Sequence, residues 1–102
     1  MTNQEKISYI ANNVNITESL IQLAEECNEL SVMVMKYVRK LNGINPTPMS
    51  SEQIMNRIVE EYNDVRLCVD VLQTRATHDG IYNKKLNRWV KRLKIEEAKK
   101  YE

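Results

Sequence analysis

The chain has 102 residues and a formal net charge of +1, so its charge gives no reason to expect a nucleic acid or a membrane surface as partner. Two glycines, two prolines and no phenylalanine favour an all-α fold, and the length suits a single domain over residues 1–102. No apolar run approaches the roughly 20 residues that span a bilayer. The N-terminus lacks the basic-then-apolar order of a signal peptide, so we expect a cytoplasmic protein.

Hydrophobic periodicity predicts four helices, over about residues 4–13, 18–41, 51–77 and 81–99, which we expect to pack as a four-helix bundle. The first is short and amphipathic, and Asn12 and Asn13 should end it. Thr17 is the expected N-cap of the second helix, with Glu18 in the first turn, where the helix dipole favours an acid.

The second helix is apolar on two sides. One side is close to a heptad seam and comprises Leu20, Leu23, Cys27, Leu30, Val34, Val38 and Leu41. The other comprises Ile21, Ala24, Val32 and Met35. A helix with two apolar sides needs two partners, so we expect it at the centre of a bundle or shared with another subunit.

Residues 42–50 form the one clear break in the helical pattern. Gly43 is well placed to end the preceding helix, and Pro46 and Pro48 prevent its continuation. Ser50 with Gln53 should form a capping box for the next helix. The segment is either a plain connector or a loop that overhangs a site and contacts a ligand.

The last two helices each have one apolar side. On the third it comprises Ile54, Ile58, Tyr62, Val65, Val69, Leu72 and Ala76. The fourth follows Asp79-Gly80, which resembles a turn or cap, and Trp89 should be its largest apolar anchor. His78 has no serine or cysteine nucleophile in a recognisable arrangement with it, so we do not expect it to be catalytic.

The strongest pattern in the chain is an acidic motif that occurs twice. Residues 24–34 (AEECNELSVMV) and 59–69 (VEEYNDVRLCV) share the order acid, acid, any residue, Asn, acid, aliphatic. Glu26 and Glu29 lie about 60° apart on one flank of their helix, and Glu61 and Asp64 do the same on theirs. Both pairs have the same relation to their apolar seams, so antiparallel packing would point them at each other. Four carboxylates brought together in this way need a cation between them, and hard oxygen ligands suit Mg²⁺ or Mn²⁺.

A simpler interpretation is that these acids lie on solvated helix faces. Glu25 and Glu60 lie about 100° round from their neighbours, so we do not expect all six acids to bind the metal directly. Asn28 and Asn63 could hydrogen-bond to the ligands or be exposed and idle.

Residues 84–100 hold eight of the fifteen Lys and Arg residues. Lys85, Arg88 and Arg92 recur at i, i+3 and i+7 on one line of the fourth helix. The segment is either a solvated helix or a row of cations that folds over the acidic cluster and holds a polyphosphate.

These residues resemble a known family. Glu25–Leu30, Glu60–Val65 and a later Lys85-Leu86-Asn87-Arg88 with Arg92 look like the motifs of the MazG-like nucleoside triphosphate pyrophosphohydrolases, which are all-α hydrolases. The similarity covers roughly residues 17–93 and is greatest to small forms encoded by phages and prophages.

The resemblance implies Mg²⁺-dependent cleavage of a (d)NTP to (d)NMP and pyrophosphate, by attack of a metal-activated water at the α-phosphate. It implies that the metal ligands are Glu26, Glu29, Glu61 and Asp64, and that Glu25 or Glu60 orients or activates the water. Lys85, Asn87, Arg88 and Arg92 would bind the substrate. It also implies a homodimer or homotetramer.

Tyr62-Asn63 replaces the small pair of many relatives, which leaves the width of the base pocket and the preferred nucleotide undecided.

Two alternative functions stay open. An inactive nucleotide-sensing oligomer would release no pyrophosphate, and a purely structural helical oligomer would not respond to Mg²⁺.

Overall fold

The computed structural model describes residues 1–44, 47–76 and 79–101, and these residues form four α-helices without a β-strand. The helices are α1 (Asn3–Asn13), α2 (Ile16–Asn42), α3 (Ser51–Ala76) and α4 (Asp79–Lys99). The predicted all-α class and the four predicted helices are confirmed. Residue 77, the predicted last residue of the third helix, and His78 lie outside the described residues.

The short helix α1 begins with a capping box that the sequence analysis missed. The backbone amide of Thr2 donates to Oε1 of Glu5 over 3.0 Å, and Thr2 Oγ1 accepts from the Glu5 amide over 3.1 Å. As predicted, the helix ends at Asn13.

The N-cap of α2 differs from the prediction. Asn15, not Thr17, caps the helix, because its side-chain oxygen accepts from the amide of Glu18 over 2.8 Å. At the other end, Gly43 caps the helix with φ of 68°, the left-handed conformation that glycine adopts most readily. Ser50 and Gln53 then form the predicted capping box before α3, with hydrogen bonds of 2.8 and 3.1 Å.

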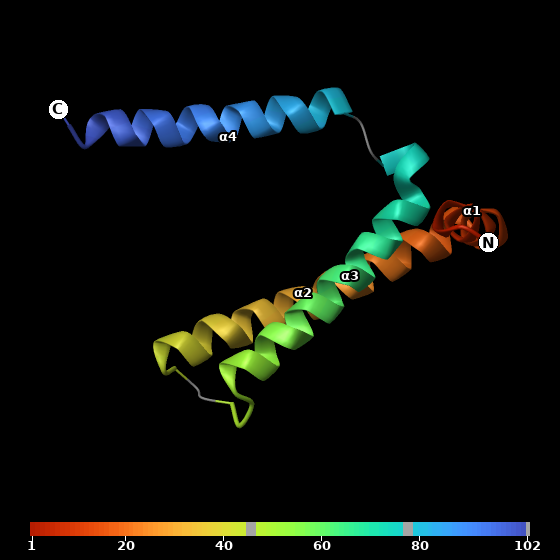
Figure 1. Cartoon of the computed structure of the whole chain (residues 1–102), viewed down its shortest axis with the longest axis horizontal. Helices are drawn as coiled ribbons and strands as arrows, with labels where there is room; N and C mark the ends of the chain where they lie inside the picture. Colours follow the sequence, from red (N-terminus) through yellow and green to blue (C-terminus); the bar gives the residue numbers. More distant parts are fainter. Residues whose placement is uncertain (45–46, 77–78, 102) are drawn as a thin grey trace.

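Helices α2 and α3 lie side by side and antiparallel (Figure 1). Helix α1 packs on α3 at the end of the pair opposite the connection between α2 and α3 (Figure 1). The buried apolar side chains of the described residues are few: Met33 of α2, and Ile54 and Leu72 of α3, of which Ile54 is fully buried. Ile58, Val65 and Val69 are half-buried, so the predicted seam of α3 is largely correct. Tyr62 is exposed, and Ala76, the last predicted residue of this seam, lies outside the residues whose side chains are described.

The predicted seam of α2 is only partly correct. Leu23 and Leu30 face the partner helix, but Leu20 is 52% exposed, and Cys27, Val34, Val38 and Leu41 are exposed as well. The side that packs on α3 instead carries Ser19, Leu23, Glu26, Leu30 and Met33, a heptad rotated toward the acids. The buried positions of α2 are thus Ser19 and Met33, while large apolar side chains such as Leu20 and Leu41 stay exposed. The second predicted strip is also open, with Met35 49% exposed.

Helix α4 extends away from the other three helices (Figure 1). Among the described residues it packs against none of them, and all of its residues are exposed. Trp89, the expected anchor, is 67% exposed in the single chain, and Asp79-Gly80 begins the helix rather than forming a turn before it. The radius of gyration is 18.3 Å, whereas a compact domain of this length has about 13 Å. None of the helices, over the residues described, has an apolar stretch long enough to cross a membrane.

Candidate metal and nucleotide site

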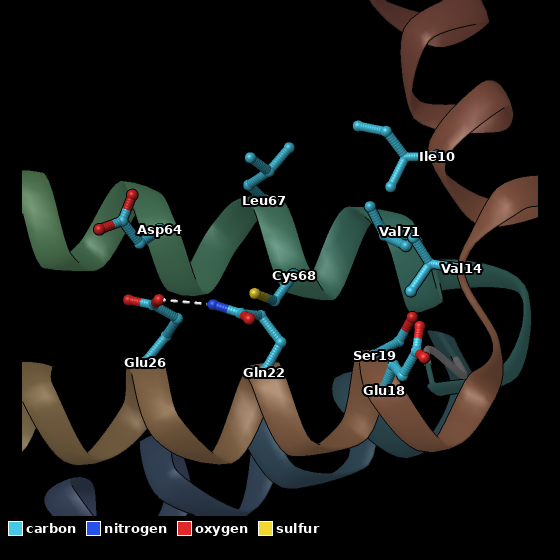
Figure 2. Close-up of a pocket in the computed structure, with 10 residues that line it drawn as sticks. All are labelled: Ile10, Val14, Glu18, Ser19, Gln22, Glu26, Asp64, Leu67, Cys68 and Val71. Atoms are coloured by element: carbon cyan, nitrogen blue, oxygen red, sulfur yellow. Dashed lines mark hydrogen bonds between the residues drawn. The ribbon is translucent and has the colours of Figure 1, made fainter.

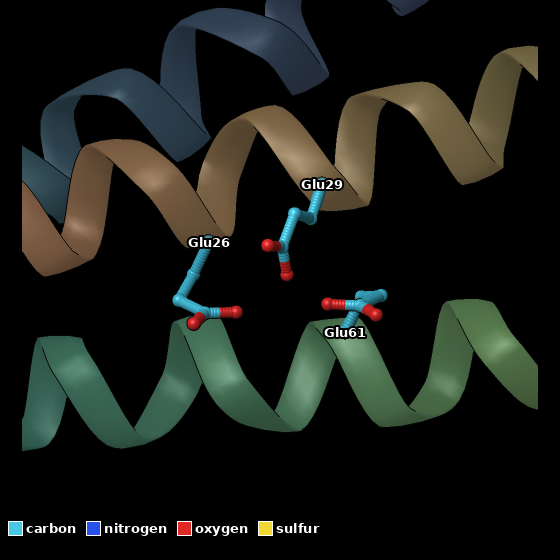
Figure 3. A group of neighbouring side chains, drawn as sticks. All are labelled: Glu26, Glu29 and Glu61. Atoms are coloured by element: carbon cyan, nitrogen blue, oxygen red, sulfur yellow. The ribbon is translucent and has the colours of Figure 1, made fainter.

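The antiparallel packing of α2 and α3 brings acids of the two repeated motifs together. Carboxylate oxygens of Glu26, Glu29 and Glu61 all lie within 4.8 Å of one another (Figure 3). Glu26 and Glu29 point from α2 and Glu61 from α3, into the space between the helices (Figure 3). Three of the four expected metal ligands therefore converge.

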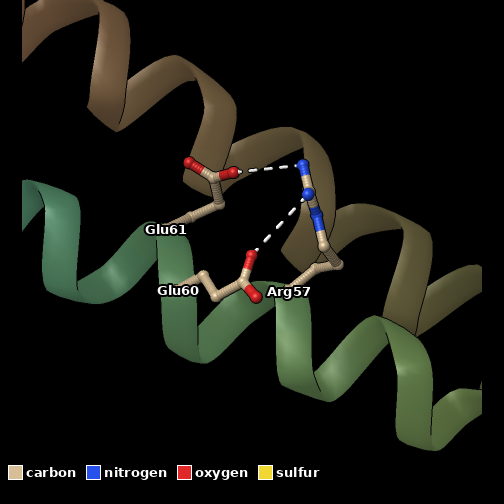
Figure 4. Close-up of polar contacts among 3 residues, drawn as sticks. All are labelled: Arg57, Glu60 and Glu61. Atoms are coloured by element: carbon tan, nitrogen blue, oxygen red, sulfur yellow. Dashed lines mark hydrogen bonds and ion pairs between the residues drawn. The ribbon is translucent and has the colours of Figure 1, made fainter.

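Glu61 is the most buried of these acids, with 6% of its surface exposed. Its Oε1 atom accepts a 3.4 Å hydrogen bond from Nη2 of Arg57, one helical turn earlier (Figure 4). Its Oε2 atom is buried and has no hydrogen-bond partner. A buried carboxylate oxygen without a partner is costly, and a cation beside it would remove that cost.

Glu26 has the same arrangement on the other helix. Its Oε1 accepts from Nε2 of Gln22 over 2.8 Å, and its Oε2 is buried without a partner. Burial raises the pKa of Glu26 above its ordinary value, and the nearby charges of Glu29 and Asp64 raise it further, whereas the hydrogen bond from Gln22 acts in the opposite direction. This is the electrostatic signature of carboxylates held close without a counter-ion.

Asp64, the fourth expected ligand, is exposed and lies outside the group of three. It lines an adjoining pocket together with Glu26, but its carboxylate points away from α2 (Figure 2). The pocket has a volume of about 400 Å³. Its apolar lining comes from Ile10, Val14 and α3, whereas α2 contributes only polar side chains: Glu18, Ser19, Gln22 and Glu26. The acids therefore lie at one end of a hollow large enough for a small ligand.

The two acids expected to act on water lie outside the group of three. Glu25 and Glu60 are both exposed, and neither belongs to the group of three. Glu60 Oε2 lies 3.6 Å from Nη1 of Arg57, the same guanidinium that holds Glu61 (Figure 4). Asn63 donates to the carbonyl of Val59 over 2.8 Å, so its amide supports its own helix rather than a ligand, and Asn28 is exposed.

The expected phosphate-binding residues are not brought to the acids in the single chain. Lys85, Asn87, Arg88 and Arg92 are exposed on α4, which does not pack against the other described helices. Lys85, Arg88 and Arg92 share one side of that helix and line a shallow groove with Trp89.

Cys68 lies beside the acids, in the pocket wall, and is half-buried (Figure 2). Burial raises the pKa of its thiol, and the negative charges of Glu26 and Asp64 raise it further. A thiol held in its protonated form is a poor nucleophile, so Cys68 serves as a wall of the pocket.

Two residues of this site, Gln22 and Arg57, were not predicted from the sequence. Each stands four residues before a buried acid and hydrogen-bonds to it. The i, i+4 spacing of a donor and a carboxylate on one helix was the available signal.

The donor set fits a hard divalent cation. It consists of carboxylates only, with two buried oxygens that lack partners, and it contains no histidine or thiolate to favour zinc. Comparison with protein-family models, with curated proteins and with solved structures found no match to this chain.

Proposed function

We propose that this protein is a Mg²⁺-dependent nucleoside triphosphate pyrophosphohydrolase, which cleaves a (d)NTP to (d)NMP and pyrophosphate. The observation that carries the proposal is the convergence of Glu26, Glu29 and Glu61 from two copies of one motif, with buried, unpartnered oxygens on Glu26 and Glu61. Mn²⁺ would serve in place of Mg²⁺, because it accepts the same oxygen ligands.

In this proposal the chain's acids have separate tasks. Glu26, Glu29 and Glu61 hold the metal, and Asp64 completes the set from the pocket side. When bound, Mg²⁺ would neutralise phosphate oxygens and lower the pKa of a water molecule. Arg57 keeps Glu61 oriented through the 3.4 Å contact between Nη2 and Oε1.

The reaction requires a proton acceptor and an in-line attack. The water oxygen forms a bond to the α-phosphorus while the bond to the bridging oxygen breaks, and pyrophosphate leaves. Glu60 or Glu25 accepts the proton of the water, since both are exposed carboxylates next to the cluster in sequence.

Lys85, Asn87, Arg88 and Arg92 are the proposed contacts of the triphosphate. They would reach it from a second copy of the chain or after reorientation of α4. A homodimer or homotetramer is part of the proposal, because α2 and α4 both present large apolar side chains to solvent.

The direct test is a screen of canonical and damaged NTPs and dNTPs with Mg²⁺, with products identified by chromatography. Release of pyrophosphate and a nucleoside monophosphate supports the proposal. Release of orthophosphate, or binding without cleavage, contradicts it.

A further inference from the structure

The 400 Å³ pocket beside the acids is a second feature of the site, and the metal does not account for it. Glu26, Asp64 and Gln22 lie at one end, and at the other end the apolar Val14 and Val71 lie beside Glu18 and Ser19 of α2 (Figure 2). The apolar side chains of the wall are Ile10 of α1, Val14 at the C-cap of α1, and Leu67, Cys68 and Val71 of α3. A ligand that fits has a charged part at the acid end and a flat, weakly polar part at the other.

We propose that this pocket binds the nucleobase of the substrate, and that Gln22 is a specificity-determining residue that contacts both the base and the metal cluster. The inference rests on the proposed function and extends it to the part of the nucleotide that the acids do not recognise. Apolar pockets with a few placed polar groups are the usual sites for such rings.

The orientation of Gln22 follows from its partner. A carboxylate oxygen only accepts hydrogen bonds, so the group that faces Glu26 Oε1 over 2.8 Å is the amide nitrogen of Gln22. The side-chain carbonyl oxygen is therefore left to face the pocket as an acceptor (Figure 2). Nucleobases carry N–H donors on their hydrogen-bonding edge, which matches this acceptor.

The position of the pocket also agrees with the way in which a bound nucleotide would extend from the acids. The pocket shares Glu26 with the group of three acids, so a nucleotide whose phosphates meet the metal has its sugar and base directed along the helix pair toward α1. Ser19, which is buried at the α2 side of this hollow, adds a hydroxyl to the wall.

The test compares nucleotides with inorganic tripolyphosphate, which has the anhydride bonds but no base. For Val71→Trp, which fills the apolar end, the ratio of kcat/KM for NTPs to that for tripolyphosphate should fall about tenfold or more. For Gln22→Leu, the rank order of KM among ATP, CTP, GTP and UTP should change. Ile95→Trp on α4 is the matched control and should keep the wild-type ratio, since it places the same side chain away from the pocket.

An unchanged ratio in Val71→Trp together with an unchanged rank order in Gln22→Leu overturns the inference. Failure of the wild type to cleave any NTP overturns the proposed function instead, and binding still tests the pocket. In a methyl NMR titration without Mg²⁺, the uncharged nucleosides adenosine, cytidine, guanosine and uridine are the probes. Shifts of Val14, Leu67 and Val71 with at least one of them support the pocket, and no shift with any of them at millimolar concentration contradicts it.

Discussion

Gln22 and Arg57 occupy equivalent positions two residues before the two repeated motifs, and each hydrogen-bonds to the acid one helical turn later. Gln22 Nε2 lies 2.8 Å from Glu26 Oε1, and Arg57 Nη2 lies 3.4 Å from Glu61 Oε1. In both cases the remaining carboxylate oxygen is buried without a partner. The repeat thus extends back to a donor that fixes one oxygen of each acid and leaves the other toward the space between the helices.

The first prediction concerns metal binding. Mg²⁺ or Mn²⁺ should raise the melting temperature, because a ligand that binds only the folded state stabilises it by mass action. Glu61→Gln should abolish most of that increase and keep the helix content seen by circular dichroism. Glu52→Gln, an exposed acid on the same helix, should retain the wild-type shift. Equal melting temperatures with and without metal in the wild type would contradict the site.

The second prediction concerns Arg57. Its loss leaves the buried carboxylate of Glu61 without its donor, which should cost about 1 kcal/mol in the free energy of unfolding without metal. The cluster also becomes more negative, so the Mg²⁺-induced rise in melting temperature should be larger in Arg57→Met than in the wild type.

Urea unfolding with and without Mg²⁺ measures both effects. Arg66→Met, which removes another exposed arginine from the same helix, should behave like the wild type. Equal stability and equal metal responses in Arg57→Met and the wild type would show that Arg57 does not act on Glu61. A smaller response would contradict the predicted gain and show that the orienting effect of Arg57 on Glu61 outweighs its charge.

The third prediction concerns assembly. Leu20, Val34, Val38 and Leu41 line one exposed side of α2, and Ile21, Val32 and Met35 line another. Contiguous exposed apolar surface of this kind marks an interface, so we expect at least a homodimer, with a tetramer as the larger possibility. Val38→Glu and Met35→Glu each place a charge on one of these sides, and the one that dissociates the oligomer identifies the interface. Light scattering that finds a wild-type monomer at micromolar concentration would refute the prediction.

The fourth prediction separates phosphate contacts from metal ligands. Arg88→Ala should lose about a hundredfold in kcat/KM, with partial recovery at high substrate, because one charged contact is worth roughly 3 kcal/mol. Asp64→Asn should lose at least as much in kcat, without recovery. Steady-state kinetics with the NTP of highest kcat/KM measures both effects. If Arg88→Ala has the kinetics of the wild type, α4 does not bind the phosphates and is only a solvated helix.

The fifth prediction concerns acidification. The hydrogen bond from the Thr2 backbone amide lowers the pKa of Glu5 below its ordinary value of 4.5, with the Thr2 side chain contributing further. Because the folded pKa is the lower one, this stabilisation of α1 is present above pH 4.5 and is lost as the pH falls through and below that value.

Glu5→Gln keeps a side-chain oxygen for the capping box but cannot titrate. Hydrogen exchange should therefore show better protection of α1 in the wild type than in Glu5→Gln near neutral pH, and no difference at pH well below 4.5. The same difference at both pH values would contradict the role of the carboxylate.

Local features of the fold could be predicted from the sequence because they depend on residues close together in the chain. The Ser50–Gln53 capping box and the glycine cap at Gly43 are of this kind, and both have the predicted geometry. The phase of the acids relative to the apolar residues is also local, since it follows from 3.6 residues per turn. The meeting of Glu26, Glu29 and Glu61 then required only the antiparallel hairpin that residues 42–50 allow.

Features that depend on the approach of two surfaces could not be predicted. Several positions of α2 are apolar, and periodicity does not tell which of them faces α3: Ser19 and Met33 are buried, while Leu20 and Val34 are exposed. The side of α2 that packs on α3 contains the small side chain of Ser19 and the acid Glu26. Likewise, the cations of α4 are opposite in charge to the acids. Electrostatic attraction acts over a long range, so it does not determine where a helix packs. Only the tertiary structure placed α4 apart from the acids within one chain and formed the pocket between α1, α2 and α3.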